Sequence, residues 1–127
     1  MVKAAGPLFF ASPFHSMTPY LYVVSAWPER AAADRLAEAA IAGRLAACAQ
    51  ISGPVASRYR WEGKIEAAEE WICILKSRAD LFPELEKCIR QHHSYEAPEI
   101  IALPITLGAA AYLDWMDREL LPRNDNA

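Results

Sequence analysis

Among the three cysteines and three histidines of this 127-residue sequence, three stand out as donors for a transition metal: Cys48, His92 and His93. A thiolate is a soft ligand that suits Cu(I), and a neutral imidazole binds copper or zinc near pH 7. These residues are therefore the candidate metal ligands. Adjacent histidines on a helix point about 100° apart, and two or three donors do not fill a coordination shell. A complete site therefore needs donors from another element or another subunit.

Each of these donors also has a structural interpretation. Free cysteine is among the most buried residue types, and alanine neighbours favour packing of Cys48 as a small hydrophobe. His92 continues an apolar stripe at helical spacing, which favours a structural histidine. His93 is expected to reach a cleft, together with Tyr95 and Glu99.

A cysteine and a histidine can also act as nucleophile and general base. Nothing in the sequence places a third group that would orient the histidine, and no oxyanion hole can be assigned around Cys48. The sequence therefore predicts a protein that is not an enzyme and has no obligatory cofactor. Copper or another divalent cation is the expected metal ligand.

A second group combines aromatic rings with charged groups: Tyr59, Trp61, Glu62, Lys64, Tyr95 and Glu99. Aromatic walls with a few polar groups are typical of a pocket for a small molecule. The alternatives are cross-strand packing for Trp61 and solvated turn positions for Glu62 and Lys64. A solvated strand face is also expected for the acidic residues Glu66, Glu69 and Glu70.

Composition excludes several classes of protein. Hydrophobic residues make up 54% of the chain and charged residues 23%, which indicates a globular domain. The net charge of −3 argues against nucleic-acid binding, which needs a positive face. No apolar run approaches the roughly 20 residues of a membrane helix. The three widely spaced cysteines match neither a disulfide framework nor a zinc pair, and favour reduced thiols in a cytoplasmic protein.

The chain is predicted to hold one domain over residues 19–121, between a disordered extension (1–18) and a flexible tail (122–127). The apolar patch at residues 8–11 weakly resembles a signal peptide, but no small-residue cleavage site follows it. Met17 is an alternative start, which would leave residues 1–16 as an unstructured extension.

Hydrophobic periodicity predicts the elements of this domain. The run 20–25 is β-branched and aromatic, which is typical of a strand. From Glu29 the apolar residues follow helical spacing. Gly43 is placed to end this helix in the left-handed conformation, which glycine adopts at little cost. A second strand is predicted over 45–52, with Gly53-Pro54 as a bend or bulge.

The chain then alternates apolar and polar residues over 55–62 and returns over 64–77. This pattern predicts a long hairpin whose tight turn is Glu62-Gly63. Asp80 is placed to cap a second helix that runs to His92.

A fourth strand is predicted over 99–105, and a last helix follows Gly108 and stops before Pro122. The order β-α-β-β-α-β is the ferredoxin-like α+β arrangement, here with an additional C-terminal helix. Two helices cover only one face of such a sheet, yet the runs 20–25 and 71–75 are apolar on both faces. The last helix can cover part of the second face. A partner subunit is the more economical cover, so the sequence predicts an oligomer.

Four segments in register resemble the CutA family: LAAC (45–48), SRYRWEGK (57–64), HHSYEAPEI (92–100) and YLDW (112–115). The resemblance covers residues 19–121. It implies a ferredoxin-like subunit, a tight homotrimer formed through sheet edges, and a role in tolerance of divalent cations, copper above all. Cys48 matches the family's cysteine, and the residues at the hairpin tip would lie near the junction between subunits.

The resemblance also implies an architecture related to the PII signalling trimers, whose clefts between subunits bind small effectors. A small-molecule sensor or interaction scaffold is therefore the alternative function, and it rests on fold analogy. The sequence departs from the family at Ser94, where proline is usual, and at Gly53-Pro54, where Pro-Gly is common. It also has AQIS (49–52) in place of the usual aliphatic run.

Overall fold

The structure, a computed structural model, describes residues 18–123; the rest of the predicted extension and residues 124–127 of the predicted tail lie outside the described residues. The elements are β1 (Tyr20–Trp27), α1 (Arg30–Ala42), β2 (Cys48–Trp61), β3 (Lys64–Arg78), the 3-10 helix η3 (Ala79–Leu81), α2 (Phe82–His92), β4 (Ile100–Pro104) and α3 (Ala110–Glu119). In this part of the chain the strands form one antiparallel sheet in the order β2-β3-β1-β4. The predicted ferredoxin-like α+β fold with an additional C-terminal helix is confirmed.

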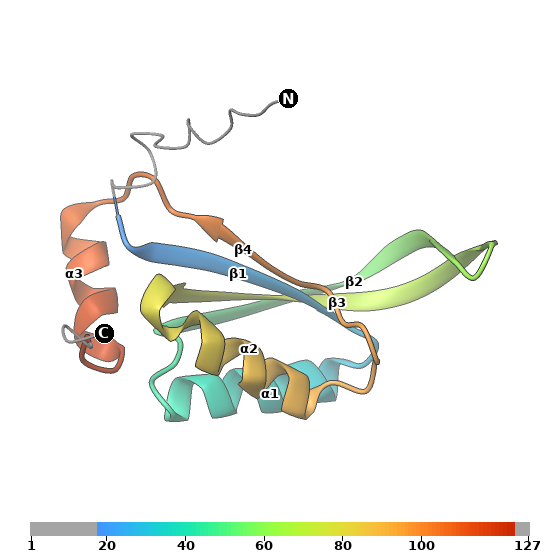
Figure 1. The fold of residues 1–127 in the computed structure, drawn as a ribbon, viewed down its shortest axis with the longest axis horizontal. Coiled ribbons are helices and arrows are strands. Elements are labelled where there is room, and N and C mark those ends of the chain that lie inside the picture. The colour runs from blue at the N-terminus through green and yellow to red at the C-terminus, as the bar shows by residue number, and fades with distance from the viewer. Residues whose placement is uncertain (1–17, 124–127) are drawn as a thin grey trace, which may run out of the picture.

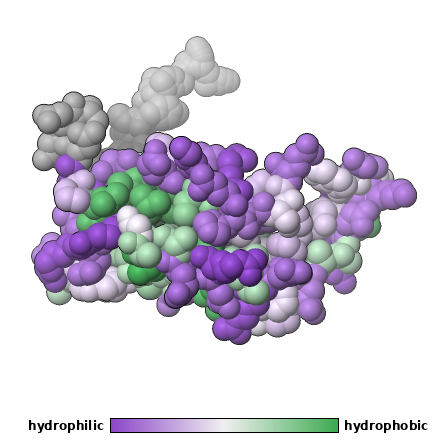
Figure 2. All heavy atoms as spheres, turned by 90° about the horizontal axis from the view of Figure 1, so that it is seen from below, coloured by the Kyte–Doolittle hydropathy of each residue, from purple (hydrophilic) through white to green (hydrophobic). Residues whose placement is uncertain are grey.

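Helices α1 and α2 lie on the same face of the sheet (Figure 1). Successive strand residues point to opposite faces, so alternate positions such as Val23 and Leu75 meet the helices. There they pack with Leu36 of α1 and with Leu85 and Ile89 of α2, and all of these side chains are fully buried. The outer surface of the two helices is mostly hydrophilic, with hydrophobic side chains gathered toward the α3 end (Figure 2).

The opposite face of the sheet is also apolar and is less covered. Val24 and Ile74 on this face are only partly buried, and Ile101 and Leu103 of the edge strand β4 are 50% and 47% exposed. Helix α3 packs at one end of this face, where the Tyr20 hydroxyl donates to its Asp117 carboxylate over 3.0 Å. Among the described residues, no other helix packs there.

Strands β2 and β3 form a hairpin that extends well beyond the rest of the domain (Figure 1). The register shifts between Ser52 and Val55, so the predicted irregularity at Gly53-Pro54 is confirmed as a bulge. Glu62 (φ 50°) and Gly63 (φ 81°) both adopt positive φ, as a type I′ turn requires. The predicted hairpin turn is therefore confirmed.

Two local predictions are wrong. Gly43 has φ −83°, and the left-handed position belongs to Arg44 (φ 58°), whose guanidinium donates to two carbonyls at the end of α3. These hydrogen bonds offset the strain of a positive φ in a residue with a side chain. Asp80 does not cap α2, because it lies in η3 and its carboxylate accepts hydrogen bonds from Arg78. The residue that precedes α2 is Leu81, without a side-chain cap.

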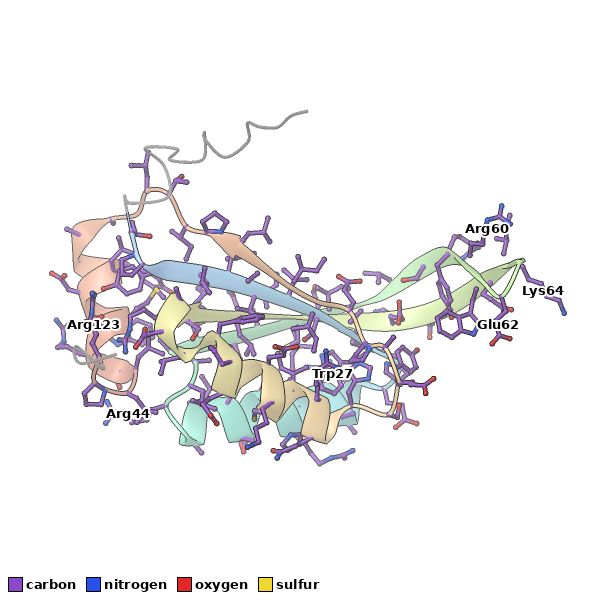
Figure 3. The ribbon with its side chains drawn as sticks, in the orientation of Figure 1. Trp27, Arg44, Arg60, Glu62, Lys64 and Arg123 are labelled. Carbon is purple, nitrogen blue, oxygen red and sulfur yellow. The ribbon has the colours of Figure 1, made fainter. Side chains whose placement is uncertain are left out.

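Arg78 connects α3 to the sheet. Its side chain is 1% exposed, and its guanidinium pairs with Asp80 (3.0 Å) and Asp117 (3.1 Å) and donates to the Leu121 carbonyl (2.6 Å). Arg123, labelled in Figure 3, pairs with Asp117 from the outside. The hydrogen bonds from Arg78 lower the pKa of Asp80. None of the helices in residues 18–123 is long and apolar enough to span a membrane.

Candidate functional site

His93 holds the loop after α2 against the sheet. It is the first residue beyond the helix, in extended conformation. Its Nε2 lies 2.7 Å from the Ala26 carbonyl and acts as donor, while its Nδ1 accepts the Tyr95 backbone N–H over 3.1 Å. The ring also packs against Trp27 (4.2 Å between centroids) and Tyr95 (4.8 Å), in both cases with the ring planes tilted. Both ring nitrogens are therefore occupied within the chain, and the contact between the two rings helps to position Tyr95.

Tyr95 in turn contacts an acidic residue of β3. Its hydroxyl donates to the Glu70 carboxylate over 3.4 Å, a long hydrogen bond. Residue Glu70 is only 8% exposed, whereas the sequence predicted that it lies on a solvated strand face. Burial, and then the Glu70 charge, raise the pKa of Tyr95. The phenol therefore stays protonated and acts as a donor at neutral pH.

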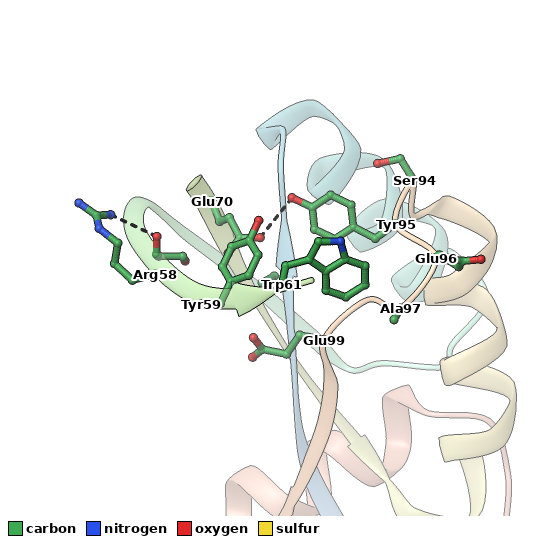
Figure 4. A pocket seen from close by; sticks show the side chains of 11 residues that line it. Arg58, Tyr59, Trp61, Glu70, Ser94, Tyr95, Glu96, Ala97 and Glu99 are labelled. Atoms are coloured by element: carbon green, nitrogen blue, oxygen red, sulfur yellow. Dashed lines mark hydrogen bonds between the residues drawn. The ribbon is translucent and has the colours of Figure 1, made fainter. Parts of the chain in front are cut away.

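The hairpin and this loop enclose a pocket of about 640 Å³ (Figure 4). Three aromatic side chains converge on it: Tyr59 and Trp61 from β2, and Tyr95 from the loop. The small residues Ala26 and Ala97 also line it. A volume of this size lies within the range of small-molecule sites, roughly 300–1,000 Å³.

The charged groups around the pocket are mostly acidic. Glu70, Glu96 and Glu99 line it with carboxylates. Arg58 is the one positively charged side chain among the lining residues, and its guanidinium donates to the neighbouring Ser57 carbonyl over 3.2 Å. In Figure 4 this guanidinium points away from the aromatic side chains. The pocket thus combines aromatic walls with an excess of negative charge.

Four of the residues predicted to line a cleft lie in this pocket: Tyr59, Trp61, Tyr95 and Glu99. Glu62 and Lys64 do not line it; they occupy the hairpin tip and point outward (Figure 3). Sequence reasoning missed Glu70, although it precedes the apolar run that was recognised as the buried part of its strand.

The predicted metal donors occupy separate places. Cys48 is the first residue of β2 and pairs with Lys76. The next residue, Ala49, packs on the core, and successive strand residues point to opposite faces, so the Cys48 side chain lies on the second, less covered face of the sheet. His92 uses its Nδ1 to donate to the Cys88 carbonyl over 2.9 Å, which leaves its Nε2 as an acceptor. Within residues 18–123, no group of three or more His, Cys, Asp or Glu side chains is arranged to hold a metal ion. The donors of one chain therefore do not make a complete site.

Comparisons with known proteins show the family of this chain. Residues 21–119 match the family model described as CutA1 divalent ion tolerance protein. The divalent-cation tolerance protein CutA of Escherichia coli is 38% identical over 105 residues, which cover 83% of this chain and 94% of that protein. The chloroplastic protein CutA of Arabidopsis thaliana is 39% identical over 98 residues, 77% of this chain. This chain matches only 54% of the length of that plant relative.

Solved structures agree with the sequence matches. CutA1 from Oryza sativa superposes with a TM-score of 0.80 at 36% identity, over 84% of this chain and 98% of that one. The divalent cation tolerance protein of Thermus thermophilus superposes with a TM-score of 0.78 at 35% identity, over 80% and 98% of the two chains. Because the sequence match covers most of its domain, this chain belongs to the CutA1 divalent ion tolerance family.

Proposed function

We propose that this chain forms a homotrimer that binds divalent metal ions, copper above all, and contributes to tolerance of them. The observation that carries this proposal is the match of residues 21–119 to a divalent ion tolerance family. The role is binding and not catalysis. In support, His93 already uses both ring nitrogens in hydrogen bonds, so it would have to give one up to act as a base.

The second face of the sheet supports the assembly. Ile101 and Leu103 of β4 expose apolar side chains on this face, and among residues 18–123 no strand pairs with the outer side of β4. Exposed apolar strand edges favour pairing with another chain. Ile101→Lys would place a charge on this edge and should weaken the trimer, while Lys87→Glu on the outer side of α2 should leave it intact.

Cys48 is the donor best placed for copper. Its thiol lies on the second face, where a neighbouring subunit would supply the further ligands that one chain lacks. His92 offers Nε2 as a second soft-to-intermediate donor. His93 would first have to release a hydrogen bond, so its contribution to a metal site is the weakest of the three.

Competition against a coloured Cu(I) chelator tests this metal site. Reduced wild-type protein should withdraw Cu(I) from the chelator, and Cys48→Ala should weaken this affinity by about tenfold or more, given the effects of smaller changes around metal sites. Cys88→Ala, which removes a partly buried thiol on α2, is the matched control and should behave as wild type. Equal affinity of the wild type and Cys48→Ala would contradict a role for Cys48.

The pocket favours a second candidate function, a sensor or scaffold that binds a small molecule. Its support is the volume of about 640 Å³ and the convergence of three aromatic rings on it. In the trimer this pocket is expected near a junction between subunits. A thermal-shift screen against charged and neutral metabolites tests this function, and an absence of any stabilising compound would count against it.

The cytoplasm is the proposed location, on the basis of the reduced cysteines that the sequence favours. The name of the Arabidopsis relative places that protein in the chloroplast. Cell fractionation with an antibody against this chain would decide between compartments.

A further inference from the structure

The geometry points to a ligand class for the pocket: an organic ammonium cation with an apolar shell, of the size of a quaternary ammonium group. This inference rests on the second proposed function, the small-molecule pocket. It depends on three features of the site, which are its aromatic walls, its buried carboxylate and its size.

The aromatic walls suit a cation. The faces of Trp, Tyr and Phe rings carry partial negative charge, and Trp binds cations best. Tyr59, Trp61 and Tyr95 reach the pocket from two separate elements, so a guest can contact more than one ring. The tilted contact of Tyr95 with His93, at 4.8 Å between centroids, keeps one of these rings in place before a ligand arrives.

The buried carboxylate gives the pocket its charge preference. Glu70 is only 8% exposed, and the Tyr95 hydroxyl is its one hydrogen-bond donor among the described side chains, at the long distance of 3.4 Å. Tyr95 contacts one carboxylate oxygen, and the other, which is not a buried atom without a partner, remains open to a positive group in the pocket that Glu70 lines. Glu96 and Glu99 at the rim add negative charge, and the Arg58 guanidinium is turned outward.

The size of the pocket separates an organic cation from a metal ion. A bare divalent ion needs several donors within about 2–2.6 Å, and the described residues provide no such group of side chains. A space of about 640 Å³ lined by rings and by Ala26 and Ala97 instead accommodates methyl or methylene groups around a diffuse charge. Such a cation needs few directed hydrogen bonds, which matches the apolar walls.

Choline and its neutral isostere 3,3-dimethylbutan-1-ol test the inference, because the two have nearly the same shape and differ in charge. Binding to the full chain would be measured by ligand-observed NMR, with sodium chloride balancing the choline chloride so that ionic strength is constant. Choline should bind about tenfold more tightly than the alcohol, the difference expected from one or two cation–π contacts and a carboxylate. Added salt should weaken choline binding and leave the alcohol unchanged.

Matched variants assign the binding to the pocket. Trp61→Leu and Glu99→Gln should each weaken choline binding several-fold, and Trp61→Phe should retain part of it. The controls are Trp115→Leu on α3 and Glu69→Gln on the same strand as Glu70; both lie outside the pocket and should bind choline as the wild type does. Light scattering and circular dichroism of every variant check that assembly and folding are unchanged.

Two results would overturn the inference. Equal binding of choline and the alcohol, with loss of both in Trp61→Leu, would leave a small-molecule pocket but refute its preference for cations. Binding of neither probe would also refute the ammonium class. In that case a thermal-shift screen that found another ligand would preserve the second proposed function, and a screen without any ligand would end it as well.

Discussion

Replacement of His93 tests whether this residue positions the pocket. His93→Ala removes the hydrogen bonds to the Ala26 carbonyl and from the Tyr95 N–H, together with the ring contacts with Trp27 and Tyr95. A hydrogen bond contributes about 1 kcal/mol to stability, and an aromatic contact about 0.5–1.5 kcal/mol. Because His93 is only partly buried, we expect the low end of the sum, a loss of about 2–3 kcal/mol.

Two conservative variants separate the two hydrogen bonds. The amide nitrogen of His93→Gln can occupy the place of Nε2 and keep the bond to the Ala26 carbonyl. The amide oxygen of His93→Asn can occupy the place of Nδ1 and keep the bond from the Tyr95 N–H. Each variant should recover about 1 kcal/mol of the loss in His93→Ala, the contribution of one hydrogen bond.

The assay combines denaturant unfolding with hydrogen exchange. Unfolding must be compared at equal protomer concentration, because assembly makes apparent stability depend on concentration. The Tyr95 amide should lose its protection in His93→Ala and His93→Gln, and keep it in His93→Asn. Full protection of the Tyr95 amide in His93→Ala, or a loss of stability below about 0.5 kcal/mol, would refute the positioning role.

Three further predictions concern the rest of the domain. Arg78→Met should destabilise the protein by about 3 kcal/mol, which is the low end for a broken buried ion pair, because Asp80 and Asp117 can regain water. Urea unfolding measures this change in stability, and a loss below about 1 kcal/mol would contradict the prediction. Pairing with Arg78 lowers the pKa of Asp80, so the ionised carboxylate stabilises the fold. This stabilisation is fully present above the ordinary Asp pKa of about 3.9, and it is lost as the pH falls through the pKa of Asp80 in the folded protein. Thermal stability should therefore drop below about pH 4 in the wild type and drop less in Asp80→Asn; equal acid sensitivity of the two would be the contrary result. Burial, with a smaller effect of the Asp34 charge, raises the pKa of Cys73 to about 11. Iodoacetamide near neutral pH should leave Cys73 unlabelled in the folded protein and label it in urea, and mass spectrometry would reveal any labelling of the folded form.

Local patterns were sufficient to predict the order of the main helices and strands, although β2 begins at Cys48 and not at residue 45, and η3 was not predicted. The change from a period of two to a period of 3.6 residues marks each strand and helix, and the order of elements then determines the fold. The hairpin turn at Glu62-Gly63 was predictable because positive φ at a two-residue turn strongly favours glycine. The end of α1 was not, since Arg44 is held in its left-handed conformation by carbonyls of α3, far along the chain.

The site was harder to predict, because its contacts join distant segments. His93 was considered as a metal ligand from its residue type, but its role in the structure depends on a carbonyl 67 residues earlier in the chain. Glu70 was expected in water because glutamate usually is, but it is largely buried and accepts a hydrogen bond from Tyr95, which is 25 residues later. Residue type thus indicated which side chains could do chemistry, while the tertiary contacts determined which of them face the pocket.

Static light scattering over a range of protein concentrations, with and without one equivalent of copper per chain, tests the proposed assembly most directly. We predict a particle of three times the 14.1 kDa chain mass in both conditions, and a smaller particle for Ile101→Lys. A monomer without metal that assembles only when copper is added would contradict the account, because the metal and not the apolar sheet face would then hold the subunits together.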